Sequence, residues 1–154
     1  MIGTPVTLKA REIAQRVFEG KTDITGYPYM HMREAVAEKM ESEYTAAAAL
    51  LLDVYDCSDI TEKSLIGEGM PMSVVYVLYS ITQRKDEPHQ DYLKRLARDD
   101  DLLYPVALAS AEYLGNIDNY KDITVNSIAE CGYYSMKHRL LKKYHDGESV
   151  FPDN

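Results

Sequence analysis

The sequence has no tryptophan, only two phenylalanines and only two cysteines, Cys57 and Cys131, among 154 residues. The cysteines lie far apart and match no C-x-x-C or zinc-ligand spacing, which argues against a disulfide framework and is typical of reduced thiols in a cytoplasmic protein. No apolar run approaches the roughly 20 residues that cross a bilayer, and residues 1–10 lack the features of a secretory signal. We therefore expect a cytoplasmic protein with no membrane partner.

Basic side chains are also scarce. The chain has 17 Lys and Arg against 25 Asp and Glu, which gives a net charge of -8. Nucleic-acid binding relies on clustered Lys and Arg that release counterions from the phosphates, so no nucleic-acid partner is expected. The length fits one domain, residues 1–154, because no repeat, low-complexity tract or linker divides the chain.

Apolar residues recur at helical spacing along almost the whole chain. Thr4 and Pro5 form a helix start, and Gly20 ends that helix. Residues 73–81 are rich in Val and Tyr, but a strand there would have no sheet to join, so a helix is predicted. The other predicted helices cover 32–40, 44–55, 61–67, 88–98, 102–114 and 125–144. The prediction is an all-α bundle of about seven to eight helices, with residues 146–154 as a frayed tail.

The most informative segment runs from Ala46 to Thr61 and reads AAAALLLDVYDCSDIT. It resembles the A-A-L-L-H-D-V-V-E-D-T signature of HD-domain phosphohydrolases, especially the branch that hydrolyses (p)ppGpp. Leu52 stands where that family has a histidine. Residues 26–32 (GYPYMHM) and 92–97 (YLKRLA) match further family segments, so the resemblance covers about residues 14–117. It implies an HD-domain-like helical bundle.

The resemblance also implies a divalent metal site built from two histidines and two aspartates. Met32 and Leu52 stand at the two histidine positions, and Phe18 replaces another family histidine upstream. His31 lies one position before Met32 and fits the metal role only if the preceding loop is one residue shorter. Asp53 is the one family ligand that is clearly retained.

At the remaining positions of the family's site, this sequence has acidic or small residues. Depending on where an insertion is placed, the second aspartate becomes Ser110 or Glu112. The acidic pair that positions the attacking water becomes Asp56-Cys57. The remnants of the catalytic site are therefore Asp53 and Asp56.

The leading hypothesis is an HD-fold protein that has lost hydrolysis and acts as a binding or interaction module. It needs no cofactor, and its partner is a nucleotide or a protein. Under this hypothesis Asp53 is a buried carboxylate that pairs with Lys21 or with a backbone amide.

Two alternatives stay open. The first is a metal-dependent nucleotide phosphohydrolase or pyrophosphohydrolase with rearranged ligands, which would hold Mn²⁺ or Mg²⁺. Its ligands would come from His31, Asp53, Asp56 and Glu112. The second alternative is a module that binds a nucleotide without cleaving it. The family pocket places its ligand-binding residues at Lys21, Tyr113 and Asn116.

Overall fold

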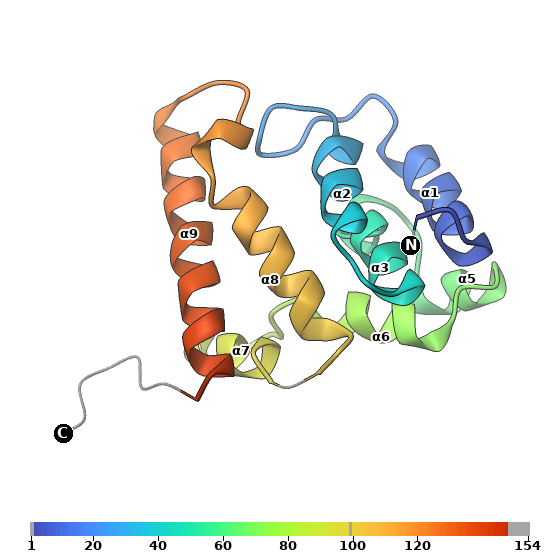
Figure 1. Ribbon diagram of the computed structural model, residues 1–154. Helices are drawn as coiled ribbons and strands as arrows, with labels where there is room; N and C mark the ends of the chain where they lie inside the picture. The colour runs from blue at the N-terminus through green and yellow to red at the C-terminus, as the bar shows by residue number, and fades with distance from the viewer. Residues whose placement is uncertain (1, 99, 148–154) are drawn as a thin grey trace.

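The computed structural model describes residues 2–98 and 100–147 and confirms the all-α prediction (Figure 1). These residues form eight α-helices of six or more residues, one single-turn helix and no strand. The helices are α1 Pro5–Phe18, α2 Tyr29–Glu38, α3 Glu43–Leu50, α4 Val54–Cys57, α5 Glu62–Gly67, α6 Met72–Ser80, α7 His89–Leu96, α8 Leu103–Leu114 and α9 Val125–His145, with a 3-10 turn, η1, over Ile117–Asn119. Among them, no helix combines the length and apolar character that crossing a membrane requires. The predicted tail lies, from residue 148 on, outside the described residues.

The hydrophobic core is built around α3. Its residues 46–49 are four consecutive alanines, and all four are fully buried. Because alanine side chains are short, α1, α2, α6 and α8 pack closely against this helix. The Val- and Tyr-rich segment 73–81 lies in α6, as predicted, and buries Val74, Val77 and Leu78. Helix α6 is therefore a core element rather than a strand.

Two predicted helix boundaries differ from the structure by three residues or more. Helix α2 begins at Tyr29, three residues before the predicted start, since the chain enters it directly from Pro28. The predicted helix 44–55 ends at Leu50 and gives way to a tight turn, in which the Leu51 amide bonds the Ala48 carbonyl at 3.1 Å. Asp53 closes this turn with a left-handed backbone (φ 69), a conformation that Asp tolerates better than most residues. The short helix α4 follows Asp53 directly.

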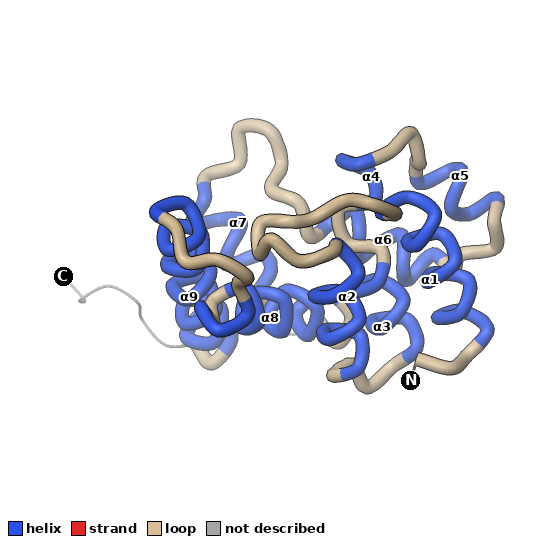
Figure 2. The backbone as a smooth tube through the Cα atoms, turned by 90° about the horizontal axis from the view of Figure 1, so that it is seen from above, coloured by secondary structure: helices blue, strands red, loops and turns tan. Residues whose placement is uncertain are grey.

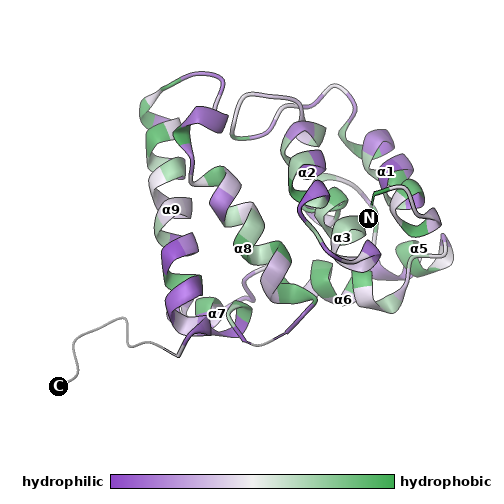
Figure 3. Ribbon diagram, in the orientation of Figure 1, coloured by the Kyte–Doolittle hydropathy of each residue, from purple (hydrophilic) through white to green (hydrophobic). Residues whose placement is uncertain are grey.

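Helices α8 and α9 form a pair beside the α1–α3 group (Figures 1 and 2). They approach closely at Gly115, where a Cβ atom would lie 2.8 Å from the Cα of Ser135. The loop between the two helices also contacts the α1–α2 loop, because the Lys121 amide donates to the Thr25 carbonyl at 2.7 Å. Figure 3 shows α6 as largely hydrophobic, whereas α9 mixes hydrophilic and hydrophobic residues along its length. The two helix groups are therefore joined through their loops as well as through the core.

Candidate functional site

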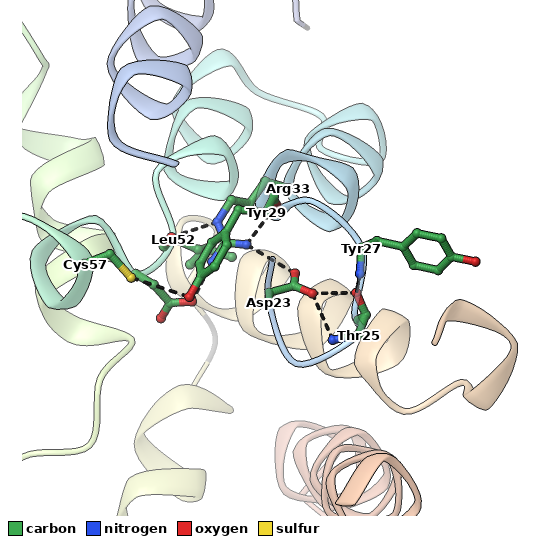
Figure 4. Close-up of polar contacts among 8 residues, drawn as sticks. Asp23, Thr25, Tyr27, Tyr29, Arg33, Leu52 and Cys57 are labelled. Atoms are coloured by element: carbon green, nitrogen blue, oxygen red, sulfur yellow. Dashed lines mark hydrogen bonds and ion pairs between the residues drawn. The ribbon is translucent and has the colours of Figure 1, made fainter. Parts of the chain in front are cut away.

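A buried arginine, Arg33 of α2, lies beside Tyr29 and Leu52, and Asp23 approaches it from the α1–α2 loop (Figure 4). Its Nη2 donates to Asp53 Oδ2 at 2.6 Å and its Nε donates to the Leu52 carbonyl at 2.9 Å. Its Nη1 donates to the Tyr29 carbonyl at 3.0 Å. The Arg33 side chain is 1% exposed, whereas that of Asp53 is 56% exposed. Every nitrogen of the guanidinium therefore has a partner, and Asp53 presents its other side to solvent.

Aromatic rings complete the enclosure of Arg33. Its Cζ lies 4.7 Å from the ring centroid of Phe18 and 4.5 Å from that of Tyr29. The two rings stack on each other with centroids 4.7 Å apart. A guanidinium is weakly hydrated and interacts favourably with aromatic faces, so this position suits arginine better than lysine.

A second carboxylate, that of Asp23 in the α1–α2 loop, also balances the charge of the Arg33 guanidinium. Asp23 is largely buried, and its Oδ2 lies 3.6 Å from Arg33 Nη1 with no hydrogen-bond partner of its own. Its Oδ1 accepts hydrogen bonds from the amide and hydroxyl of Thr25. Burial lowers the pKa of Arg33, while the charges of Asp53 and Asp23 act against that shift. Burial also raises the pKa of Asp53, and Arg33 opposes the rise.

Lys21 and Asp56, two of the candidate residues, lie in this region but do not bind Asp53 directly. Lys21 Nζ donates to the Cys57 carbonyl at 3.2 Å, so Asp53 pairs with Arg33 rather than with Lys21. Asp56 lies exposed in the first turn of α4, one helical turn from Asp53. Its charge contributes to the raised pKa of the Asp53 carboxyl.

The other candidates have separate partners. Glu112 on α8 lies 4.0 Å from Lys39 Nζ and 3.8 Å from His138 Nε2. The His31 ring stacks on Tyr27 with centroids 4.8 Å apart. Neither group shares a partner with Asp53 in the described chain. Across residues 2–98 and 100–147, no three His, Cys, Asp or Glu side chains form a group that could hold a metal ion.

Among the nucleotide candidates Lys21, Tyr113 and Asn116, the side chains of Lys21 and Asn116 have separate hydrogen-bond partners. The Asn116 side chain caps η1 by accepting from the Asp118 amide at 3.0 Å. Tyr113 is buried on α8, where desolvation raises the pKa of its hydroxyl. Ser110, the other residue considered for the second aspartate position, donates its hydroxyl to the Ala107 carbonyl of the same helix. Among the described residues, the Lys21 side chain therefore shares no hydrogen-bond partner with Tyr113 or Asn116.

Sequence reasoning missed Arg33, although a signal was present. Arg33 lies on the same face of its helix as Tyr29, Val36 and Ala37, of which the last two are buried. An arginine on an apolar helix face needs an acceptor for its guanidinium, which the sequence alone can signal. The partner itself lies 20 residues away in the sequence, so only the fold identifies it.

Lys137 of α9 is a second cation that the sequence did not single out. Its Nζ donates to the Tyr92 hydroxyl at 3.2 Å and lies 5.1 Å and 5.7 Å from the ring centroids of Tyr92 and Tyr134. Burial among these rings lowers the pKa of Lys137 to about 8, and the charge of Asp53 opposes the shift. Lys137 therefore connects α9 to Tyr92 of α7.

The lowered pKa of Lys137 predicts a pH-dependent stability. Between about pH 8 and the ordinary lysine pKa of 10.5, the unfolded chain binds a proton that the folded chain has released. The free energy of unfolding should therefore rise with pH above about 8, by about 1–3 kcal/mol in total after allowance for solvent screening. Urea unfolding from about pH 7 to 9 measures the first part of this rise, where tyrosines of ordinary pKa (about 10) are still mostly protonated in the unfolded chain.

The Lys137→Met variant is the control for this pH dependence. It removes the charge but keeps most of the apolar stem, so its stability should vary less over the same range than that of the native protein. At higher pH the trend reverses, because burial raises the pKa of Tyr134 to about 12 and folding then opposes tyrosine ionisation. Parallel pH curves for the two proteins would contradict the assignment to Lys137.

Searches against models of known protein families and against curated proteins found no match to this chain.

Proposed function

We propose that this protein is an HD-fold-related module that binds a partner and does not carry out metal-dependent hydrolysis. In this proposal the Arg33 guanidinium supplies the positive charge that a metal ion supplies beside the aspartate in the enzymes the sequence resembles. The domain would then keep its helical frame for recognition rather than for catalysis.

The observation that carries the proposal is that each guanidinium nitrogen of Arg33 already donates a hydrogen bond within the protein. Its guanidinium contacts Asp53 and the carbonyls of Leu52 and Tyr29 in a nearly fully buried position. A permanently charged guanidinium at 2.6 Å neutralises the carboxylate without a cation. The hydrogen bond from the buried Arg33 therefore gives Asp53 a structural partner, while the rest of the Asp53 side chain faces solvent.

The residues around Asp53 do not fit a transition-metal centre. Leu52 and Met32 stand at the histidine positions of the family that the sequence resembles, and both side chains are buried in the core. Neither supplies the nitrogen donor that favours a transition metal. Arg33 offers only N–H donors toward Asp53, and these compete with a cation for the carboxylate. A Mn²⁺ site of the kind that the enzyme alternative requires would have no nitrogen donor at these two positions.

Thermal unfolding of the metal-stripped protein with and without Mn²⁺ tests the proposal. A site with a dissociation constant of about 10 µM would stabilise the protein by about 2.7 kcal/mol at about 1 mM Mn²⁺, a shift of several degrees in Tm. We expect no shift, and no phosphate or pyrophosphate release from (p)ppGpp or GTP with Mn²⁺ or Mg²⁺.

The Asp53→Asn variant is the matched control, because asparagine keeps the shape of the side chain and tolerates the left-handed backbone. A Tm shift in the native protein that disappears in Asp53→Asn would overturn the proposal. Metal-dependent phosphate release lost in the same variant would do so as well, and would favour the enzyme alternative with rearranged ligands.

A further inference from the structure

Lys137 lies where α9 packs against α7, and its partners differ from those of the lysines that form ion pairs (Figure 1). Lys9 and Lys39 each lie within 4.0 Å of a carboxylate oxygen. Lys137 has no carboxylate at that distance in the part of the chain that the structure describes. Its Nζ instead donates to the hydroxyl of Tyr92 on α7 at 3.2 Å. The amine is therefore held by a neutral group rather than by a counter-charge.

The Tyr92 hydroxyl holds the Lys137 amine without using its lone pair. This hydroxyl donates its own hydrogen to the Ile81 carbonyl at 2.6 Å. Because a phenol carries one hydrogen, the Tyr92 oxygen acts toward Lys137 as an acceptor. A neutral lysine amine would satisfy that acceptor with one N–H and keep its lone pair free. The lone pair is the part of an amine that attacks a carbonyl carbon.

The surroundings of Lys137 favour the neutral amine. The ring centroids of Tyr92 and Tyr134 lie 5.1 Å and 5.7 Å from Nζ, and these rings replace water that would solvate an ammonium. Burial lowers the pKa of Lys137 to about 8, although the charge of Asp53 opposes the shift. Near neutral pH, the neutral fraction is then about a hundredfold larger than for an ordinary lysine. Lys137 and Tyr134 are only half-buried, so the amine stays open to small molecules from solvent.

We propose that Lys137 forms a Schiff base with a small uncharged aldehyde. The Nζ lone pair forms a bond to the carbonyl carbon, and one amine proton passes to the carbonyl oxygen to give a carbinolamine. The second amine proton then leaves with the hydroxyl group as water, and a C=N double bond remains. No oxidant or reductant is required. The proposal goes beyond the binding role and involves residues other than the Arg33–Asp53 pair.

The chemistry around the amine selects an uncharged aldehyde. The two tyrosine rings offer an apolar surface beside Nζ. The charge of Asp53 acts on Lys137 and would repel an anionic aldehyde. A small aldehyde also fits a half-buried amine better than a bulky one.

Reductive alkylation with propionaldehyde and cyanoborohydride at about pH 7.5 tests the proposal, because the reductant traps each imine as a stable amine. Peptide mapping by mass spectrometry gives the rate at each lysine and separates it from the N-terminal amine. Lys137 should react at least about tenfold faster than Lys142, an exposed lysine of the same helix. The same chain unfolded in urea is the matched control, and there the two rates should be equal.

A folded-state ratio of the two rates that matches the ratio in urea would overturn the proposal. Glyoxylate, an anionic aldehyde, should give a smaller folded-state ratio, and an equal or larger one would overturn the assignment of an uncharged aldehyde.

Two variants assign the fast reaction to its residue. Lys137→Arg keeps the charge but lacks the nucleophilic amine, so the fast lysine reaction should disappear. Lys142→Arg should leave the rate at Lys137 unchanged. Circular dichroism confirms that each variant is folded. None of these outcomes depends on the metal and hydrolysis measurements that test the proposed function.

Discussion

Replacing Arg33 by methionine should destabilise the protein by about 3–5 kcal/mol, the range found when one partner of a buried ion pair is removed. The loss follows from what the guanidinium leaves behind. Asp23 would keep a buried carboxylate without its cation, and the carbonyls of Leu52 and Tyr29 would lose their side-chain donor. Methionine fills much of the same space, so the effect would report charge and hydrogen bonds more than a cavity. Urea unfolding followed by circular dichroism measures it.

Two further variants separate the parts of the Arg33 interaction. Asp53→Asn should cost less than Arg33→Met, about 1–2 kcal/mol, because the Asp53 side chain is half exposed and asparagine still accepts a hydrogen bond. Arg33→Lys keeps the charge but cannot reach three partners in the fixed geometry of a guanidinium, so its stability should fall between the two. If Arg33→Met loses less than about 1 kcal/mol, the cluster is not the structural ion pair described above.

The Leu141→Ala variant should destabilise the protein by about 2–5 kcal/mol, the usual cost of truncating a buried leucine. Helix α9 has 21 residues, but only Ser127, Cys131 and Leu141 are buried among them. Leu141 is the one fully buried large side chain that this helix contributes within the described residues. Its truncation removes the main apolar anchor of α9 against the core. Urea unfolding gives the loss in free energy, and proteolysis of the native state shows whether α9 opens first.

Leu140→Ala is the matched control for Leu141. Leu140 is the adjacent residue and has the same side chain, but it is only partly buried at the edge of the core. Its truncation should cost about 1 kcal/mol or less, because part of its surface already contacts water. Similar losses for the two variants would contradict the anchoring role of Leu141.

The local features of the fold could be predicted because their causes are local. Thr4 caps α1 and Pro5 follows it, as the sequence indicates, and helix formation depends on bonds between residues four apart. Segment 73–81 was assigned to a helix because no other strand was available to pair with it, and α6 confirms this. The helix end at Leu50 was missed because four alanines and three leucines favour helix locally. The turn that breaks it places Asp53 beside Arg33.

The candidate site depends on contacts that no local pattern specifies. The sequence by itself determined that apolar side chains stand at Met32 and Leu52, because residue identity fixes donor chemistry whatever the fold. Only the tertiary structure decided that Arg33 is the partner of Asp53, since the pair joins residues 20 positions apart and its strength depends on burial. The tertiary structure also decided that Lys137 of α9 lies against Tyr92 of α7, because burial depends on what the rest of the chain covers.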